Sequence, residues 1–153
     1  VSPYGLTYMD SGMAWGGRLL SPTGIFGAEN SDAPNERAIG RHLIFMTDGK
    51  LEFELQNYSH QGLETVERRV SGIGSTASQA SVQNLHISRF EKICRDVKAR
   101  GITIWTVNFA STVSNAENNC SSSGTTYKAS NNAELIGVFK SIAGQISRLR
   151  VSQ

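Results

Sequence analysis

One acid in this chain lies where α/β proteins place their ligand-binding groups. The apolar run from His42 to Thr47 (His-Leu-Ile-Phe-Met-Thr) is followed directly by Asp48 and Gly49. A short apolar segment bounded by turn residues predicts a strand buried on both faces, as in a parallel sheet. Ligands of open α/β sheets lie beyond the carboxyl ends of the strands, and a carboxylate there suits Mg²⁺, Ca²⁺ or Mn²⁺. The alternative is a structural role, because an Asp-Gly pair is also typical of turns and helix starts.

Thr7 is the second residue whose oxygen suits a hard cation. The segment Gly5-Leu6-Thr7 precedes the first expected helix and would present a hydroxyl at the same sheet edge as Asp48. A hydroxyl and a carboxylate that converge on one point are suitable ligands for such a cation. Sequence spacing does not establish this convergence, which depends on the fold.

Other kinds of site find little support in the sequence. The run Gly72-Ile-Gly74-Ser75 lacks the preceding strand, the following helix and the lysine that phosphate-binding loops require. His42, His60 and His86 lie far apart without metal-ligand spacing, so each is expected at the surface or at a strand edge. No Gly-x-Ser-x-Gly elbow is present, and neither cysteine has an activating neighbour. The sequence therefore offers no candidate catalytic nucleophile.

Length and composition indicate one ordinary globular domain. The chain has 153 residues, of which 39% are hydrophobic and 18% charged, with a formal net charge of +2. That charge is small and scattered, with no basic run beyond Arg68-Arg69, which argues against a nucleic-acid partner. No apolar stretch approaches the roughly 20 residues of a membrane span. Because the chain begins at Val1 without a signal sequence, we expect a fragment or processed product whose targeting information lies elsewhere.

The first half of the chain predicts one helix and one strand with long irregular connections. Residues 11–20 carry apolar groups at helical spacing, with Asp10 or Ser11 as the expected N-cap. A loop over 23–37 leads to the strand at 42–47. Residues 50–83 are expected to form an irregular surface insertion, within which residues 51–55 alternate like a half-exposed strand.

The second half has clearer periodicity. From residue 84 an amphipathic helix is expected, and Gly101 lies where a C-terminal cap belongs. Residues 102–109 give the strongest strand signal, a polar loop covers 110–124, and a short strand is expected at 126–129. A final helix then carries a steady apolar stripe. This order predicts an α/β fold, a Rossmann-like sandwich of parallel strands with right-handed crossovers.

The two cysteines, Cys94 and Cys120, fit no metal or redox motif. Cys94 falls on the predicted helix and Cys120 in the polar loop. A bridge between them would imply an oxidising compartment and would stabilise the fold by roughly 3–4 kcal/mol in the chain-entropy model. From the residues alone, a bridge and two free thiols are both open.

Several segments together resemble the TadG-like branch of the von Willebrand factor type A domains, across nearly the whole chain except the insertion at 50–83. The combination of Trp-Gly-x-Arg-x-Leu-Ser-Pro with Met-Thr-Asp-Gly is the more specific part of the likeness. The matching segments are Gly5-Leu-Thr7, Gly12-Met-Ala-Trp15-Gly16-Gly-Arg18-Leu-Leu-Ser21-Pro22, Phe45-Met-Thr-Asp48-Gly49, the run from Ile93 to Phe109, Cys120, and the run from Tyr127 to Arg150.

The resemblance implies a binding protein and not an enzyme. TadG-like proteins serve in bacterial tight-adherence (Flp) pilus assembly, typically anchored by one membrane helix with the A domain outside the cytoplasm. It also implies that Cys94 and Cys120 are a disulfide pair, which suits a periplasmic or extracellular location. The expected partner is a pilus-assembly or surface protein.

The metal-ion-dependent adhesion site of this family is only partly present. Thr7 and Asp48 match its threonine and its later aspartate. The first motif, Asp-x-Ser-x-Ser, is absent, because no aspartate has serine at both +2 and +4. We therefore expect the first half of the fold, with its central strand, to be missing. Since Mg²⁺ demands near-octahedral oxygen coordination, two ligands would hold it weakly.

One further expectation follows from the missing half. An unpaired apolar sheet edge beside the strand at 42–47 should favour pairing with another chain, either a second copy or a partner fragment.

The rival interpretation is a Mg²⁺-dependent hydrolase or phosphotransferase that uses Asp48. It lacks a second acid, a general base and a phosphate loop. Replacing Asp48 by alanine separates the two, since only an enzyme would lose turnover.

Overall fold

The computed structural model describes residues 6–31 and 39–151, in a mixed α/β arrangement. Three parallel strands form the main sheet in the order β1-β4-β5. A separate pair, β2 and β3, is antiparallel. The elements in chain order are α1 (Met9–Leu19), β1 (Arg41–Thr47), β2 (Tyr58–Ser59), β3 (Gly62–Leu63), α2 (Glu64–Glu67), α3 (Gln79–Ala99), β4 (Ile102–Phe109), α4 (Asn115–Cys120), β5 (Tyr127–Ala129) and α5 (Asn132–Val151).

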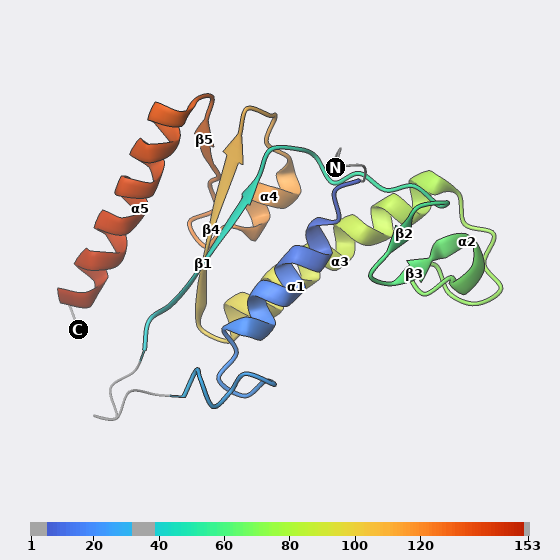
Figure 1. Cartoon of the computed structure of the whole chain (residues 1–153), viewed down its shortest axis with the longest axis horizontal. Helices are drawn as coiled ribbons and strands as arrows, with labels where there is room; N and C mark the ends of the chain where they lie inside the picture. The colour runs from blue at the N-terminus through green and yellow to red at the C-terminus, as the bar shows by residue number, and fades with distance from the viewer. Residues whose placement is uncertain (1–5, 32–38, 152–153) are drawn as a thin grey trace, which may run out of the picture.

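Helices cover both faces of the sheet, as Figure 1 shows, with α1 and α3 on one side and α5 on the other. Alternation along β4 produces this division, since neighbouring residues of a strand point to opposite faces. Ile102 and Ile104 join the core beneath α1 and α3, whereas Trp105 and Val107 pack against α5. The three strands expected at 42–47, 102–109 and 126–129 are confirmed, and the second begins and ends at the expected residues.

Two glycines allow α1 to lie close to its neighbours. A Cβ on Gly17 would come within 2.6 Å of Val97 Cγ2, and a Cβ on Gly16 within 2.7 Å of Leu43 Cδ1. Glycine within a helix costs about 1 kcal/mol relative to alanine. Glycine occupies these two positions because α1 packs closely against both α3 and β1.

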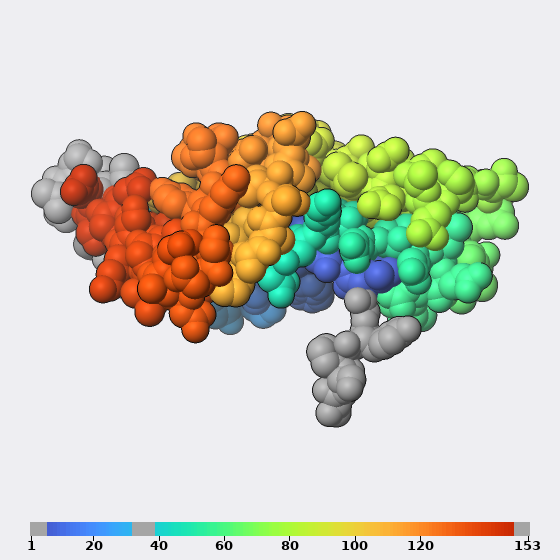
Figure 2. All heavy atoms as spheres, turned by 90° about the horizontal axis from the view of Figure 1, so that it is seen from above, coloured from blue at the N-terminus to red at the C-terminus, as the bar shows by residue number. Residues whose placement is uncertain are grey.

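The insertion carries more structure than the sequence predicts. It contains β2, β3, α2 and the first turn of α3, which begins at Gln79 with Ser78 as its cap. Residues 51–55 form no strand, although their alternation is visible as burial of Leu51 and Phe53 between exposed glutamates. In Figure 2 the insertion lies at one end of an elongated molecule and α5 at the other.

Three further sequence predictions are wrong in detail. The helix α1 begins at Met9 after Tyr8, without a side-chain cap, so neither Asp10 nor Ser11 is the N-cap. Cys120 ends the short helix α4 and does not lie in an irregular loop. His86, expected at the surface or at a strand edge, is completely buried on α3. In each case, contacts with distant segments of the chain determine where the residue lies.

Candidate functional site

Thr7 lies beside the Asp48-Gly49 turn that follows the carboxyl end of β1. The Thr7 hydroxyl oxygen is 3.6 Å from the position that a Cβ on Gly49 would take, beside Asp48. The backbone N–H of Glu52 donates a 3.1 Å hydrogen bond to the Thr7 carbonyl, which ties the chain before α1 to the chain after β1. Thr47 fixes the intervening turn, because its hydroxyl oxygen accepts from the Gly49 N–H at 3.2 Å.

At this edge of the sheet the candidate oxygen ligands are the Thr7 hydroxyl and the Asp48 carboxylate. The Asp48 side chain is exposed, and Thr7 is partly buried. Within residues 6–31 and 39–151, no three or more histidine, cysteine or acidic side chains are grouped so as to hold a metal ion. Two oxygens are too few for the near-octahedral shell of Mg²⁺. The residues described here therefore do not by themselves fit a closed magnesium site.

The two cysteines form a disulfide that joins α3 to α4. The Cys94–Cys120 bond has an S–S distance of 2.04 Å, and both side chains are buried in the core beneath α1 and α3. The pairing that the resemblance implied is therefore present. The disulfide closes a loop that contains the whole of β4, the central strand of the sheet.

A buried polar cluster connects α1 to α3, and the sequence analysis missed it. His86 Nδ1 lies 2.8 Å from Asp10 Oδ2, and Arg89 Nε lies 3.5 Å from the same oxygen. Asp10 and His86 are 1% and 0% exposed. The sequence pattern does indicate that His86 is buried, because it falls four residues before Phe90 on the apolar stripe of its helix.

The cluster lowers the pKa of Asp10. Burial acts to raise this pKa, but the hydrogen bond with His86 and the electrostatic effects of His86 and Arg89 outweigh it, so the pKa lies below its ordinary value of 3.8. Asp10 Oδ1 and His86 Nε2 have no hydrogen-bond partner among the described residues. The carboxylate is therefore fixed as an anion within the α1–α3 interface.

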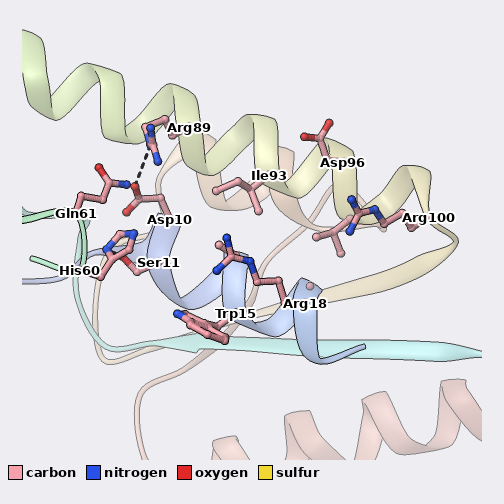
Figure 3. A pocket seen from close by; sticks show the side chains of 13 residues that line it. Asp10, Ser11, Trp15, Arg18, His60, Gln61, Arg89, Ile93, Asp96 and Arg100 are labelled. Atoms are coloured by element: carbon pink, nitrogen blue, oxygen red, sulfur yellow. Dashed lines mark hydrogen bonds and ion pairs between the residues drawn. The ribbon is translucent and has the colours of Figure 1, made fainter. Parts of the chain in front are cut away.

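Beside this cluster lies a groove between α1 and α3, which we call the α1–α3 groove (Figure 3). Its cavity volume is about 280 Å³. One end is closed by the turn between β2 and β3, where His60 Nδ1 lies 2.6 Å from the Ser11 hydroxyl oxygen. The lining includes Trp15, Arg18, His60, Gln61, Arg89 and Arg100.

Comparison with protein-family models, with curated proteins and with solved structures finds no match for this chain. Among the described residues, no helix is both long enough and apolar enough to cross a membrane.

Proposed function

We propose that this chain is a non-enzymatic binding module of the von Willebrand factor type A kind, from a TadG-like protein of pilus assembly or surface adhesion. In this proposal it supplies the later strands of the type A sheet, and a divalent cation at Thr7 and Asp48 contributes to partner binding. The location is the periplasmic or extracellular face of a bacterial membrane, and the Cys94–Cys120 disulfide supports an oxidising compartment.

The observation that carries this proposal is the position of Thr7 beside the Asp48-Gly49 turn. The two residues are 41 positions apart in the sequence and come from different elements, one before α1 and one after β1. Their meeting point is the carboxyl end of a parallel strand, where open α/β sheets bind ligands. A cation held by few protein ligands keeps open positions that an acidic group of a partner would fill.

The cation proposal predicts weak binding to this chain by itself. Thr7 and Asp48 provide two oxygens, so water would complete the coordination shell and affinity would be low. Calorimetric titration with Mg²⁺ or Mn²⁺ is the check, and no micromolar site is expected. Micromolar affinity would contradict the proposal, because it would require a ligand set that these two residues do not supply.

The apolar residues on both faces of β1 support completion of the sheet by another chain. β1 is the edge strand in the order β1-β4-β5, yet it is apolar on both faces. Leu43 packs into the core beneath α1, whereas Ile44 and Met46 on the opposite face are 42% and 52% exposed. Helix α5 covers Trp105 and Val107 but leaves this half of the sheet open. Apolar residues on both faces are typical of a central strand, and an open edge favours pairing.

We therefore predict self-association through β1, or pairing with a partner fragment. Light scattering at increasing concentration should show a dimer of this chain. Met46→Lys should weaken that dimer at least about tenfold, because a lysine on an edge strand opposes pairing. Ile73→Lys is the matched control, since Ile73 is 97% exposed in the insertion, and it should leave association unchanged. A strictly monomeric mass at high concentration would count against the prediction.

A further inference from the structure

We infer that the α1–α3 groove binds an acidic peptide segment, through carboxylate side chains spaced along its length. This inference is independent of the proposed cation site, because the groove uses neither Thr7 nor Asp48. The groove lies on the outer side of α1 and α3, and the close-up in Figure 3 shows arginines from both helices along it.

Two of the arginines have no acidic partner. Neither Arg18 nor Arg100 forms an ion pair within the described part of the chain. Asp96, the exposed acid in the lining, is instead bonded to Lys92 at 2.7 Å. The third arginine, Arg89, shares the carboxylate of Asp10 with His86. Within residues 6–31 and 39–151, the groove therefore presents the guanidinium groups of Arg18 and Arg100 without an ion pair.

Neighbouring groups hold two of these guanidinium groups in place. Arg18 lies over the ring of Trp15, 5.1 Å from its centroid, in a cation–π contact. Arg89 is oriented by the buried carboxylate of Asp10 at 3.5 Å. A guanidinium that is already oriented loses less side-chain entropy when it binds a carboxylate. This arrangement favours recognition of carboxylates over a diffuse electrostatic attraction.

The spacing of the arginines selects an extended ligand and not a single small anion. Arg89 and Arg100 are eleven positions apart in the sequence, which corresponds to about 16 Å along a helix. Figure 3 shows Arg18 between them on the opposite helix. An extended peptide covers about 16 Å in five residues. Two acidic side chains about five positions apart would therefore meet the two ends of the groove.

Volume and charge argue for a peptide and against a nucleic acid. A cavity of about 280 Å³ lies just below the range for cofactor pockets and suits one or two side chains of a larger partner. The chain carries a net charge of only +2, and two acids line the groove beside the arginines. A phosphate backbone would need a broader basic surface.

His60 adds no charge at neutral pH. Burial is the main cause that lowers its pKa below 6.5, and nearby arginines lower it further against the opposite effect of Asp10. Its contact with the Ser11 hydroxyl closes the groove at the end opposite Arg100. The recognition charge at pH 7 therefore comes from the arginines.

The test is fluorescence anisotropy with the whole chain and a labelled peptide of serines that carries two glutamates five positions apart. Arg100→Gln removes the guanidinium at one of the two ends that the glutamates would meet, and it should weaken binding about tenfold, the factor that one charge-assisted hydrogen bond contributes. Arg95→Gln makes the same charge change on the exposed part of α3 outside the groove, and it should change binding less than twofold. All variants are first compared with the parent chain by circular dichroism.

Binding of other peptides, of phosphate and of an oligonucleotide distinguishes the acidic-peptide site from the alternatives. The same peptide with glutamines, or with its glutamates adjacent, should bind at least about tenfold more weakly. Equal binding of the glutamine peptide, equal loss in Arg95→Gln, or no binding at all would overturn the inference. Displacement by millimolar inorganic phosphate would indicate a small-anion site, and tighter binding of a single-stranded oligonucleotide would indicate a nucleic-acid site. Either result would also overturn it.

Discussion

Replacing Asp10 by alanine is expected to lower the free energy of unfolding by about 3 kcal/mol or more, because the change breaks a buried polar pair by removal of one partner. His86 would lose its 2.8 Å contact while it remains completely buried, and Arg89 would lose its anchor. An unpaired polar group in the interior bears its full desolvation penalty. Urea-induced unfolding at pH 7, followed by circular dichroism, measures the difference.

Asp96→Ala is the matched control for this prediction. It removes a carboxylate that also bonds a cationic side chain, but the Lys92–Asp96 pair is on the surface of α3, with both side chains more than half exposed. Exposed pairs of this kind contribute little to stability. Equal destabilisation by the two variants would show that burial of Asp10 does not determine its contribution.

The Asp10 variant should also respond less to acid. Because the pKa of Asp10 is lower in the folded chain than its ordinary value of 3.8, the folded state binds fewer protons there. Its contribution to stability is present above about pH 4 and is lost as the pH falls through the folded pKa. The parent chain should therefore lose more stability than Asp10→Ala as the pH falls below about 4. Glu64, whose pKa the hydrogen bonds from Ser71 and Val70 lower despite burial, contributes equally in both proteins.

Removal of the disulfide is the second large effect. The double variant C94A/C120A should lose about 3.5 kcal/mol of unfolding free energy, because the bond closes a loop with a sequence separation of 26. Both sulfurs lie in the core beneath α1 and α3, so the alanines add a small packing loss. Chemical denaturation with and without dithiothreitol gives the measurement.

Dithiothreitol provides the internal control for the disulfide. Reduction should destabilise the parent chain by a similar amount and leave C94A/C120A unchanged. An unchanged parent chain under conditions that fully reduce the bond, verified by thiol titration, would contradict this estimate.

The sheet could be predicted from the sequence because its strands are local and strongly apolar. Residues 102–109 combine β-branched and aromatic side chains, and β4 occupies the same range. The alternation of helices and strands predicted parallel pairing, which the register of β1 with β4 confirms. The position of Thr7 beside the Asp48-Gly49 turn is consistent with the same topology, because Thr7 precedes α1 and the turn follows β1.

The polar cluster and the groove could not be predicted in the same way, because they depend on contacts between distant segments. Asp10 and His86 are 76 positions apart, and their pairing depends on how α1 crosses α3. The turn that closes the groove belongs to the insertion, whose local pattern is weak. Residues 51–55 show the limit of local reasoning, since Leu51 and Phe53 are buried although the segment forms no strand.

The most direct test of the central claim is a Mn²⁺ titration of the whole chain observed by nuclear magnetic resonance. Paramagnetic broadening should begin at the amides of Thr7, Asp48 and Gly49, with a dissociation constant of about 10⁻⁴ M or weaker. Asp48→Ala should remove this broadening, whereas Asp96→Ala should not. Broadening that starts elsewhere, or that persists unchanged in Asp48→Ala, would contradict the claim that Thr7 and Asp48 share a cation.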